Sequence, residues 1–383
     1  MHRYVICLGI ILLAAGAAVC PAGDAGEPVY TDGHTRITAC LGQREVLLDD
    51  GQYGLRYFPD GAMAIVRRTP ALRILIPAGV SSWLLEGKGF DSLVPVRKVL
   101  EPGGKGSFDN GYAGISGAYR DEASGELLAF YHAEDQEDMG RLPNGVRGFY
   151  CSIGLAVSKD DGQSFTKVGP IITSCLPKDP KGTRDQGCGE VCVLSDKSGQ
   201  YLYAYYTDHS RIGGRGVQIC LARSPVREHG FLPGTWTKFF EDSFSQPGLG
   251  GKDTPVVSTK DMEADAILPH VTYSKVLKKY VMVFNINAYR ELAGGSRPEK
   301  SGIYVAFSDN GLSWSNPTQL ITACSVARID GEVSWHPTLV WSDDEGPALS
   351  GWLCYSYSER WGHKPPQKGH YLVGQPITLA VHR

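Results

Sequence analysis

Three acidic residues stand beside glycine and aromatic residues, where a carboxyl group could meet a ligand. Asp109 lies in segment 106–112 (GSFDNGY), Glu190 in 186–191 (QGCGEV) and Glu332 in 330–336 (DGEVSWH). Hydrolysis of a glycosidic bond needs two carboxyl groups, one as acid and one as base or nucleophile. We expect Asp109 to be the base and Glu190 the acid, because apolar flanks raise a carboxyl pKa. Glu332 is the alternative candidate for the role of acid.

Each assignment has a structural alternative. Asp109 could cap a turn in its glycine-rich loop, and Glu190 could pair with a neighbouring arginine. His270 and His336 stand at what look like matching positions before two strands. Both could bind sugar hydroxyl groups or a central ion, or be structural histidines with satisfied hydrogen bonds.

These residues belong to a repeated two-strand pattern, seen most clearly in segment 189–206. An apolar strand is followed by a polar turn and then by a strand rich in tyrosine. The pattern recurs in segments 118–131, 270–284 and 337–357, and each copy leads into a second hairpin. Because β-branched and aromatic residues favour strands, four strands per repeat predict one blade of a β-propeller.

An N-terminal unit with strands near 62–66, 72–76, 82–85 and 94–100 brings the count to five. The last unit ends after its third strand, near 371–379, and a strand-like segment at 35–48 precedes the first unit. The sequence therefore predicts an all-β fold: a five-bladed β-propeller of four-stranded antiparallel blades, closed by an N-terminal strand. No segment of the sequence shows a convincing helical period.

One hairpin resembles the Asp-box of sialidase-type propellers, Ser-x-Asp-x-Gly-x-Ser/Thr-Trp/Phe. Segment 158–165 (SKDDGQSF) matches every specified position, and segment 309–314 keeps the turn and aromatic residue but has Phe307 where the motif has serine. The motif stabilises a hairpin and indicates little about function. From Asp60 onward, the repeats resemble the five-bladed glycoside hydrolase superfamily, which includes family 43 and the family-32-like fructosidases. The Asn-Asp-Pro and Arg-Asp-Pro signatures of fructosidases are absent.

The resemblance implies a substrate funnel lined by the starts of first strands and the ends of second strands. Asp185 and Asp253, in loops entering blades, are candidates for a third carboxylate that tunes the other two. The second-strand ends also supply Glu134 and His209. The substrate-binding candidates are Asp60, Tyr112, His132, Asp185, Asp208, Asp253, His270, Trp335 and His336.

The N-terminus has the pattern of a signal peptide. His2 and Arg3 precede an apolar run, small residues follow, and no later segment is apolar enough to span a membrane. We expect residues 1–22 to be the signal peptide, residues 30–383 to form a single propeller domain, and the protein to be secreted or periplasmic. Its eight other cysteines lack the spacing of a zinc site and are disulfides or buried thiols: Cys40, Cys151, Cys175, Cys188, Cys192, Cys220, Cys324 and Cys354.

Composition narrows the class of partner. The formal net charge is -3, and charges of both signs are interspersed, so the chain has no basic field to attract nucleic acid. We expect a carbohydrate substrate, a monomer, no metal in the catalytic site and no cofactor, with a structural cation such as calcium in the channel left open. The alternatives are a non-catalytic carbohydrate- or protein-binding propeller, and a lyase or sulfated-sugar enzyme that uses histidine and tyrosine.

Overall fold

The fold was analysed in a computed structural model. The structure describes residues 26–55, 58–141, 147–182, 184–212, 216–226, 230–257, 259, 264–287, 289–290, 295–296, 298–322, 331–342, 348–361 and 369–382. These residues form β-strands, with only short helical turns at α1 (Asp50–Tyr53), η1 (Phe90–Ser92) and η4 (Pro298–Lys300). The all-β prediction is confirmed. The predicted signal peptide lies outside the described residues.

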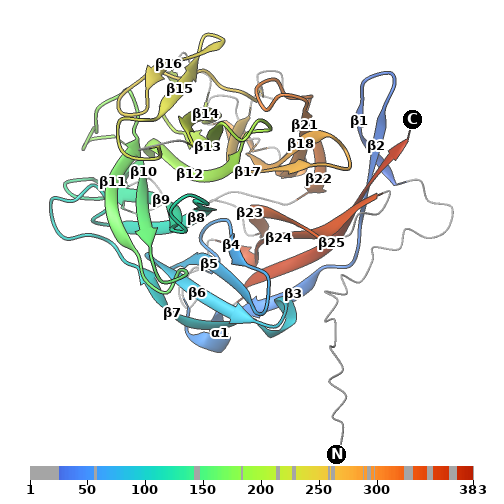
Figure 1. The fold of residues 1–383 in the computed structure, drawn as a ribbon, viewed down its shortest axis with the longest axis horizontal. Helices are drawn as coiled ribbons and strands as arrows, with labels where there is room; N and C mark the ends of the chain where they lie inside the picture. The colour runs from blue at the N-terminus through green and yellow to red at the C-terminus, as the bar shows by residue number, and fades with distance from the viewer. Residues whose placement is uncertain are drawn as a thin grey trace, which may run out of the picture.

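The strands form consecutive, mainly antiparallel groups, of which the second and third are joined into one sheet by a short parallel pairing of β10 with β12 (Figure 1). The first group contains β4 (Ala64–Arg67), β5 (Leu72–Ala78), β6 (Ser81–Gly87) and β7 (Val94–Leu100). The second contains β8 (Tyr112–Arg120), β9 (Leu127–Asp135), β10 (Tyr150–Ser158) and β11 (Thr166–Ile172). The third contains β12 (Gln186–Ser195), β13 (Tyr201–Asp208), β14 (Gln218–Pro225), β15 (Thr237–Phe240) and β16 (Ser243–Pro247). The fourth contains β17 (Asp265–Ser274), β18 (Lys279–Asn287), β21 (Gly302–Ser308) and β22 (Thr318–Thr322), and the small strands β19 (Tyr289–Arg290) and β20 (Gly295–Ser296) pair separately.

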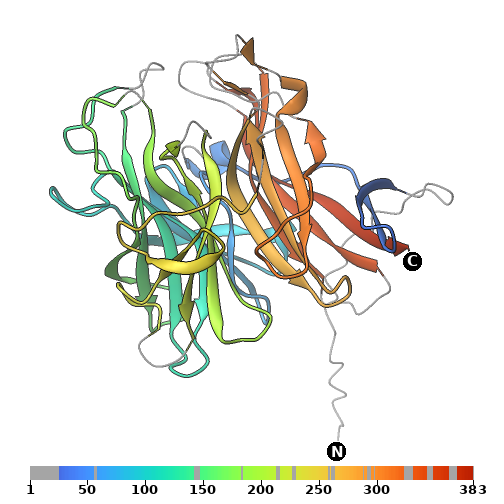
Figure 2. The ribbon, with the colours of Figure 1, turned by 90° about the horizontal axis from the view of Figure 1, so that it is seen from above.

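The last group joins the two ends of the described chain. Its C-terminal members are β23 (Gly331–Trp341), β24 (Ala348–Trp361) and β25 (His370–His382), and its N-terminal members are β1 (Glu27–Thr31), β2 (Arg36–Leu41) and β3 (Glu45–Asp49). Strand β2 pairs antiparallel with β25, from Arg36 opposite His382 to Leu41 opposite Ile377. Figure 2 shows the N-terminal strands beside the C-terminal ones. The hydrogen-bonding edge of β25 is therefore covered by the start of the chain.

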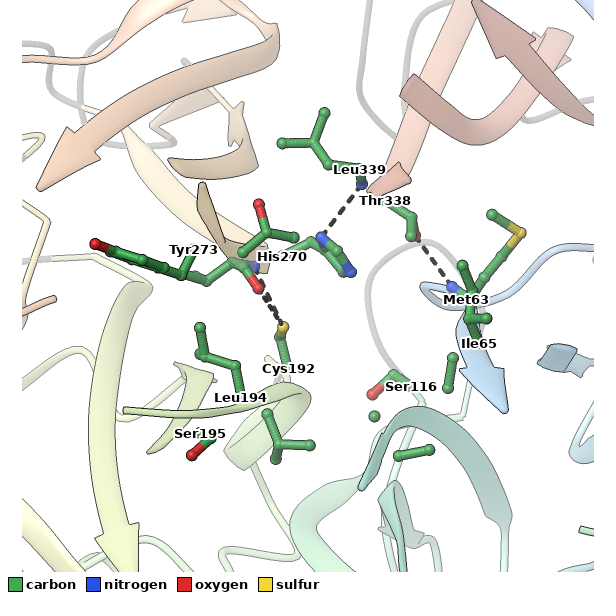
Figure 3. A pocket seen from close by; sticks show the side chains of 16 residues that line it. Met63, Ile65, Ser116, Cys192, Leu194, Ser195, His270, Tyr273, Thr338 and Leu339 are labelled. Carbon is green, nitrogen blue, oxygen red and sulfur yellow. Dashed lines mark hydrogen bonds between the residues drawn. The ribbon is translucent and has the colours of Figure 1, made fainter. Parts of the chain in front are cut away.

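The first strand of each group lines one central cavity of about 320 Å³ (Figure 3). Its wall is formed by residues 63–65, 116–118, 192–195, 270–273 and 338–339, which belong to or directly precede β4, β8, β12, β17 and β23. Five segments that are far apart in the sequence thus meet around one axis.

Side chains of these first strands link neighbouring groups through hydrogen bonds to backbone atoms. The Val191 amide donates to Ser116 Oγ at 3.2 Å, and the Val271 amide donates to Cys192 Sγ at 3.2 Å. Two further bonds continue the series: the Leu339 amide donates to His270 Nδ1 at 3.2 Å, and the Met63 amide donates to Thr338 Oγ1 at 3.1 Å. The last bond links β23 to the segment that directly precedes β4.

A backbone irregularity recurs in three first strands. Pairing shifts register between Gly189 and Cys192 in β12, and equivalent shifts occur in β17 and β23. Inside each shift, a residue other than glycine adopts a left-handed conformation: Glu190 (φ 44°), Leu268 (φ 60°) and His336 (φ 54°). His336 is therefore equivalent to Glu190, and the predicted match between His270 and His336 is wrong.

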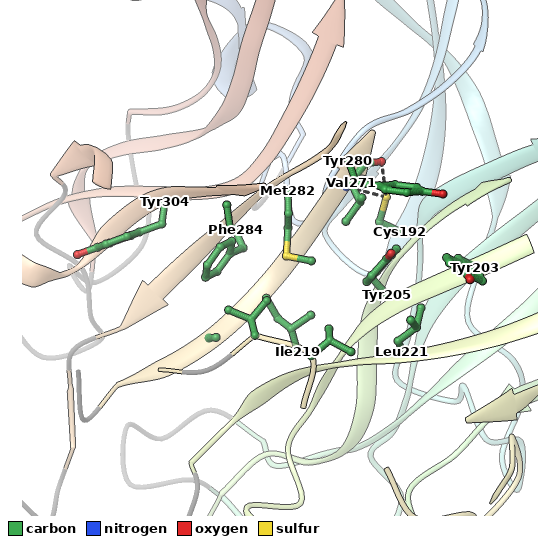
Figure 4. Close-up of a cluster of buried hydrophobic side chains, with 14 of the residues drawn as sticks. Cys192, Tyr203, Tyr205, Ile219, Leu221, Val271, Tyr280, Met282, Phe284 and Tyr304 are labelled. Atoms are coloured by element: carbon green, nitrogen blue, oxygen red, sulfur yellow. Dashed lines mark hydrogen bonds between the residues drawn. The ribbon is translucent and has the colours of Figure 1, made fainter. Parts of the chain in front are cut away.

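The hydrophobic core lies between the strand groups. Because each group packs against two neighbours, its middle strands are buried on both faces, and continuous apolar runs replace simple alternation. The cluster between the third and fourth groups contains Tyr205, Met282 and Phe284 (Figure 4). Each such side chain contributes about 1.5–3 kcal/mol through burial.

The hairpin at segment 158–165 has the hydrogen bonds that its sequence predicts. Asp160 accepts from the Ser158 hydroxyl at 2.7 Å and from the Ser164 amide at 2.9 Å. In the second such hairpin, Asn310 and Ser308 make the corresponding bonds. The equivalent of Ser158 is therefore Ser308, whereas the motif spacing had pointed to Phe307.

None of the helices in the described ranges has the length and hydropathy needed to cross a membrane. Cys40 is disulfide-bonded, and Cys324 lies outside the described residues. The predicted buried thiols are present, and all but Cys175 have little solvent exposure; the free cysteines in the described part are Cys151, Cys175, Cys188, Cys192, Cys220 and Cys354.

Candidate active site

Ionisable side chains from several strand groups influence one another's ionisation close to the start of β12. They come from the segments before β4 and β12, from β8, β9, β12 and β23, and from the residue that follows β13. The members are Asp60, Tyr112, His132, Glu134, Asp185, Glu190, His209 and His336.

Glu190 lies between two histidines. His209 Nε2 is 3.3 Å from Glu190 Oε2, and His132 Nδ1 is 3.7 Å from Glu190 Oε1. Burial opposes ionisation of this carboxyl group, but the positive charges of His132 and His209 outweigh burial and lower its pKa to about 2. The predicted rise in the Glu190 pKa is wrong, because two histidines that are distant in the sequence lower this pKa by more than the apolar surroundings raise it.

His132 has both ring nitrogens engaged. Its Nε2 is 3.2 Å from Glu134 Oε1, and its Nδ1 accepts a hydrogen bond from the Glu190 amide at 3.2 Å. Burial favours the neutral ring, but the Glu190 and Glu134 carboxylates raise the pKa of His132 to about 9. The amide hydrogen bond needs an Nδ1 without a proton, whereas the ion pair with Glu190 needs a ring that is protonated at both nitrogens. His132 therefore makes the amide contact in its neutral form and the ion pair in its protonated form.

Asp60 has a pKa close to neutral pH. Burial and the nearby Glu134 carboxylate raise its pKa from 3.8 to about 7. The hydroxyl of Tyr112 donates to the Asp60 carbonyl at 2.6 Å and fixes this segment. Tyr112 is itself 6% exposed, so it holds Asp60 in place and presents no open face for stacking on a sugar.

Two glycines allow the backbone of β12 to approach its neighbours. A Cβ on Gly189 would lie 2.1 Å from His132 Nδ1. Gly187 has φ +93°, and a Cβ there would lie 2.0 Å from the Cys151 carbonyl oxygen, where β12 pairs parallel with β10. Side chains at these positions would push Glu190 away from His132.

Asp109 lies outside this cluster. It is 1% exposed, forms an ion pair with Lys167 of β11, and accepts hydrogen bonds from Ser107 Oγ at 2.8 Å and the Tyr131 hydroxyl at 3.2 Å. Its carboxylate is thus neutralised and closed to solvent. These contacts oppose the predicted role of Asp109 as base and agree with the structural alternative.

Glu332 is exposed near the start of β23. Burial, and after it a hydrogen bond to the Glu332 carboxylate, raise the pKa of Tyr357 to about 12. The guanidinium of Arg44 lies 3.7 Å from the centre of the same tyrosine ring. Glu332 therefore belongs to an outer contact between β23 and β24.

Asp208 and Asp253 form a separate buried cluster within the third strand group. One ligand atom each from Cys188, Asp208 and Asp253 lie within 4.8 Å of one another, a spacing that a metal ion could use. However, the fully buried Lys238 ammonium is 3.0 Å from Asp253 Oδ2 and supplies the positive charge there. The arrangement is an internal ion pair, and the burial of Asp208 (7% exposed) opposes the predicted contact with substrate.

The two remaining histidine candidates differ in their surroundings. His270 lines the central cavity and accepts from the Leu339 amide, and burial lowers its pKa to about 4. It is thus a neutral structural residue. His336 is also kept neutral by burial, with a pKa of about 4, but Glu190 and His132 influence its ionisation, and its ring meets Trp335 edge-on.

Glu134, His209 and Cys151 complete the surroundings of Glu190. Glu134 and His209 were expected at the ends of second strands, and this position was the feature of the sequence that indicated a place in the site. Cys151 had no such signal; it is a fully buried thiol whose Sγ donates to the Gln186 carbonyl at 3.0 Å.

No protein-family model and no curated protein matches the chain. Solved structures do share its fold, and several of them are glycoside hydrolases. An α-L-arabinofuranosidase from Lactobacillus brevis has a TM-score of 0.54 at 13% identity, over 86% of this chain and 94% of that one. An endo-1,5-α-L-arabinanase from Thermotoga petrophila RKU-1 has a TM-score of 0.53 at 12% identity, over 84% and 72%. A protein described as a glycoside hydrolase has a TM-score of 0.50 at 14% identity, over 93% and 89%. At these identities the likeness establishes the fold: the chain has the all-β fold of these glycoside hydrolases.

Proposed function

We propose that this chain is a secreted or periplasmic glycoside hydrolase built as a five-bladed β-propeller, with β2 closing the last blade. Its substrate is a polysaccharide or oligosaccharide that contains furanoside units such as arabinose. The five strand segments around one cavity support the blade count. The α-L-arabinofuranosidase and the endo-1,5-α-L-arabinanase of similar fold support the substrate class.

The observation that carries the proposal is that the pKa values of two carboxyl groups in the same electrostatic cluster shift in opposite directions. The Asp60 pKa lies near 7, whereas that of Glu190 lies near 2. A carboxyl group that keeps its proton near neutral pH suits a general acid, and one that is fully ionised suits a base or nucleophile. We therefore assign Asp60 as the acid and Glu190 as the base or nucleophile, which reverses the role that the sequence suggested for Glu190.

The first experiment measures reducing-sugar release from a polysaccharide panel that includes arabinan. Asp60→Asn and Glu190→Gln should each lower kcat by at least about 100-fold, because each removes a proton-transfer or nucleophilic group. Glu332→Gln is the control, since Glu332 is exposed and outside the cluster, and it should retain wild-type rates. Binding without cleavage by the wild type would refute hydrolysis and favour a carbohydrate-binding protein.

A second experiment separates the two roles. A glycoside with a good leaving group, such as 2,4-dinitrophenolate, needs no proton from the enzyme. Asp60→Asn should therefore cleave this glycoside far better than the polysaccharide, relative to wild type, whereas Glu190→Gln should fail on both. The reverse pattern would exchange the two assignments.

A further inference from the structure

One side chain donates a hydrogen bond to the Glu190 carboxylate with suitable geometry. His209 Nε2 is 3.3 Å from Glu190 Oε2, and the His209 side chain is only 9% exposed. His132 is 3.7 Å from the other oxygen, which is too long for a hydrogen bond. Its two nitrogens are already engaged by the Glu190 amide and by Glu134. The two histidines therefore differ in what they do for Glu190.

The backbone around His209 is fixed by the start of β12 and by the residue that precedes it. The His209 amide donates to the Gly187 carbonyl at 2.9 Å. Arg211 Nη1 donates to the carbonyls of both Asp185 and His209, at 3.0 and 3.1 Å. Arg211 itself has φ 52°, a left-handed conformation that costs about 1–3 kcal/mol in a non-glycine residue. The fold thus retains a strained residue that holds His209 against Glu190.

Two buried polar atoms on this side of Glu190 have no hydrogen-bond partner among the described residues: His209 Nδ1 and Asp185 Oδ1. Asp185 is also in electrostatic contact with His209 and Arg211. Neither atom reaches solvent, so their effect on a reaction would pass through the side chains around them, which include His209 and Glu190.

We propose that His209 is a positioning residue that holds the Glu190 carboxylate ionised and oriented, supported from behind by Asp185 and by the Arg211 hydrogen bonds. This inference rests on the proposed function for its catalytic consequence, but its physical content concerns Glu190 alone. The ionisable groups that interact electrostatically with Glu190 are Asp60, Tyr112, His132, Cys151, Asp185, His209 and His336. Glu134 acts on His132, and Arg211 acts on Asp185.

The test is a carbon-13 NMR titration of the Glu190 carboxyl group in the full chain without substrate, assigned by its absence in Glu190→Gln. In His209→Ala, the Glu190 pKa should rise from about 2 toward its ordinary 4.5, because burial then acts with less opposition while His132 remains. His209→Gln can keep the hydrogen bond but cannot carry a charge, so it should give an intermediate value. His34→Ala, at an exposed histidine, is the matched control.

The catalytic consequence is measured separately. On a substrate that the wild type cleaves, His209→Ala should lower kcat by about 10- to 100-fold, the range for a lost hydrogen bond to a charged group. KM should stay unchanged and His209→Gln should recover part of kcat. An unchanged Glu190 pKa in both folded His209 variants would overturn the inference, whatever the activity. A shifted pKa in a protein that cleaves nothing would leave the inference intact and refute the proposed function.

Discussion

Replacing Asp109 with asparagine separates a structural carboxylate from a catalytic one. Asparagine keeps one acceptor oxygen, so one of the two hydroxyl groups, Ser107 or Tyr131, must turn to accept from the amide, and the ion pair with Lys167 is lost. Breaking a buried ion pair costs about 3–5 kcal/mol when both partners are buried. The Lys167 side chain is 28% exposed and can regain water, so we expect the free energy of unfolding to fall by about 2–3 kcal/mol.

The assay combines thermal unfolding with kinetics. For a chain of 383 residues, that loss lowers Tm by about 3–4 °C, because the entropy of unfolding scales with chain length. At temperatures well below Tm, the turnover rate should stay within about twofold of wild type, because Asp109 is sealed from solvent.

The double variant Asp109→Asn with Lys167→Met isolates the pair. It should be more stable than Asp109→Asn alone, because the lysine no longer lacks its partner. If turnover instead collapsed in Asp109→Asn by about two orders of magnitude, the loss expected for a missing general base, while Tm stayed unchanged, the reasoning would be refuted and Asp109 restored as the base.

Three further predictions address other parts of the chain. Gly189→Ala should lower kcat at least about tenfold, because the new Cβ would lie 2.1 Å from His132 Nδ1, and Gly104→Ala at an open, exposed site should have no effect; equal rates would contradict this. Because the Asp60 pKa is raised from 3.8 to about 7, the folded protein takes up a proton at Asp60 between these pH values. The stability that this proton provides is complete below pH 3.8 and is lost as the pH rises through 7. The urea midpoint should therefore fall less between pH 4 and 8 in Asp60→Asn than in wild type, and wild-type turnover should fall above pH 7. Equal falls of the midpoint in the two proteins would exclude this linkage. Thr338→Val should lower the free energy of unfolding, measured in urea, by about 1–3 kcal/mol, because the buried Met63 amide before β4 loses its hydrogen-bond acceptor. An unchanged urea midpoint would show that this hydrogen bond is dispensable.

The strand pattern was predictable because it is local. The fourth strand of the first group was expected at 94–100, and β7 spans Val94–Leu100. The pairing of an N-terminal strand with the last group was also expected, from a C-terminal unit that lacked a strand. In both cases, apolar and aromatic runs between polar turns carry the information along the chain itself.

Ionisation states were not predictable because they depend on residues distant in sequence. No residue near Asp109 in the sequence indicates that Lys167 of β11 will form an ion pair with it. The flanks of Glu190 suggested a raised pKa, but His132 and His209 arrive from β9 and from the end of β13 and lower it. Sequence position placed Asp60 at the site, yet only its burial beside Glu134 explains its shift.

The repeated left-handed residue in β12, β17 and β23 has a consequence for engineering. The same backbone irregularity carries a carboxylate at Glu190, an aliphatic chain at Leu268 and an imidazole at His336. Its conformational cost is already met by the surrounding strands, whichever side chain is present. At position 268 the backbone thus already has the conformation that carries a carboxylate or an imidazole elsewhere, but Leu268 is 7% exposed, so Leu268→His or Leu268→Glu would also need a hydrogen-bond partner for the buried polar group.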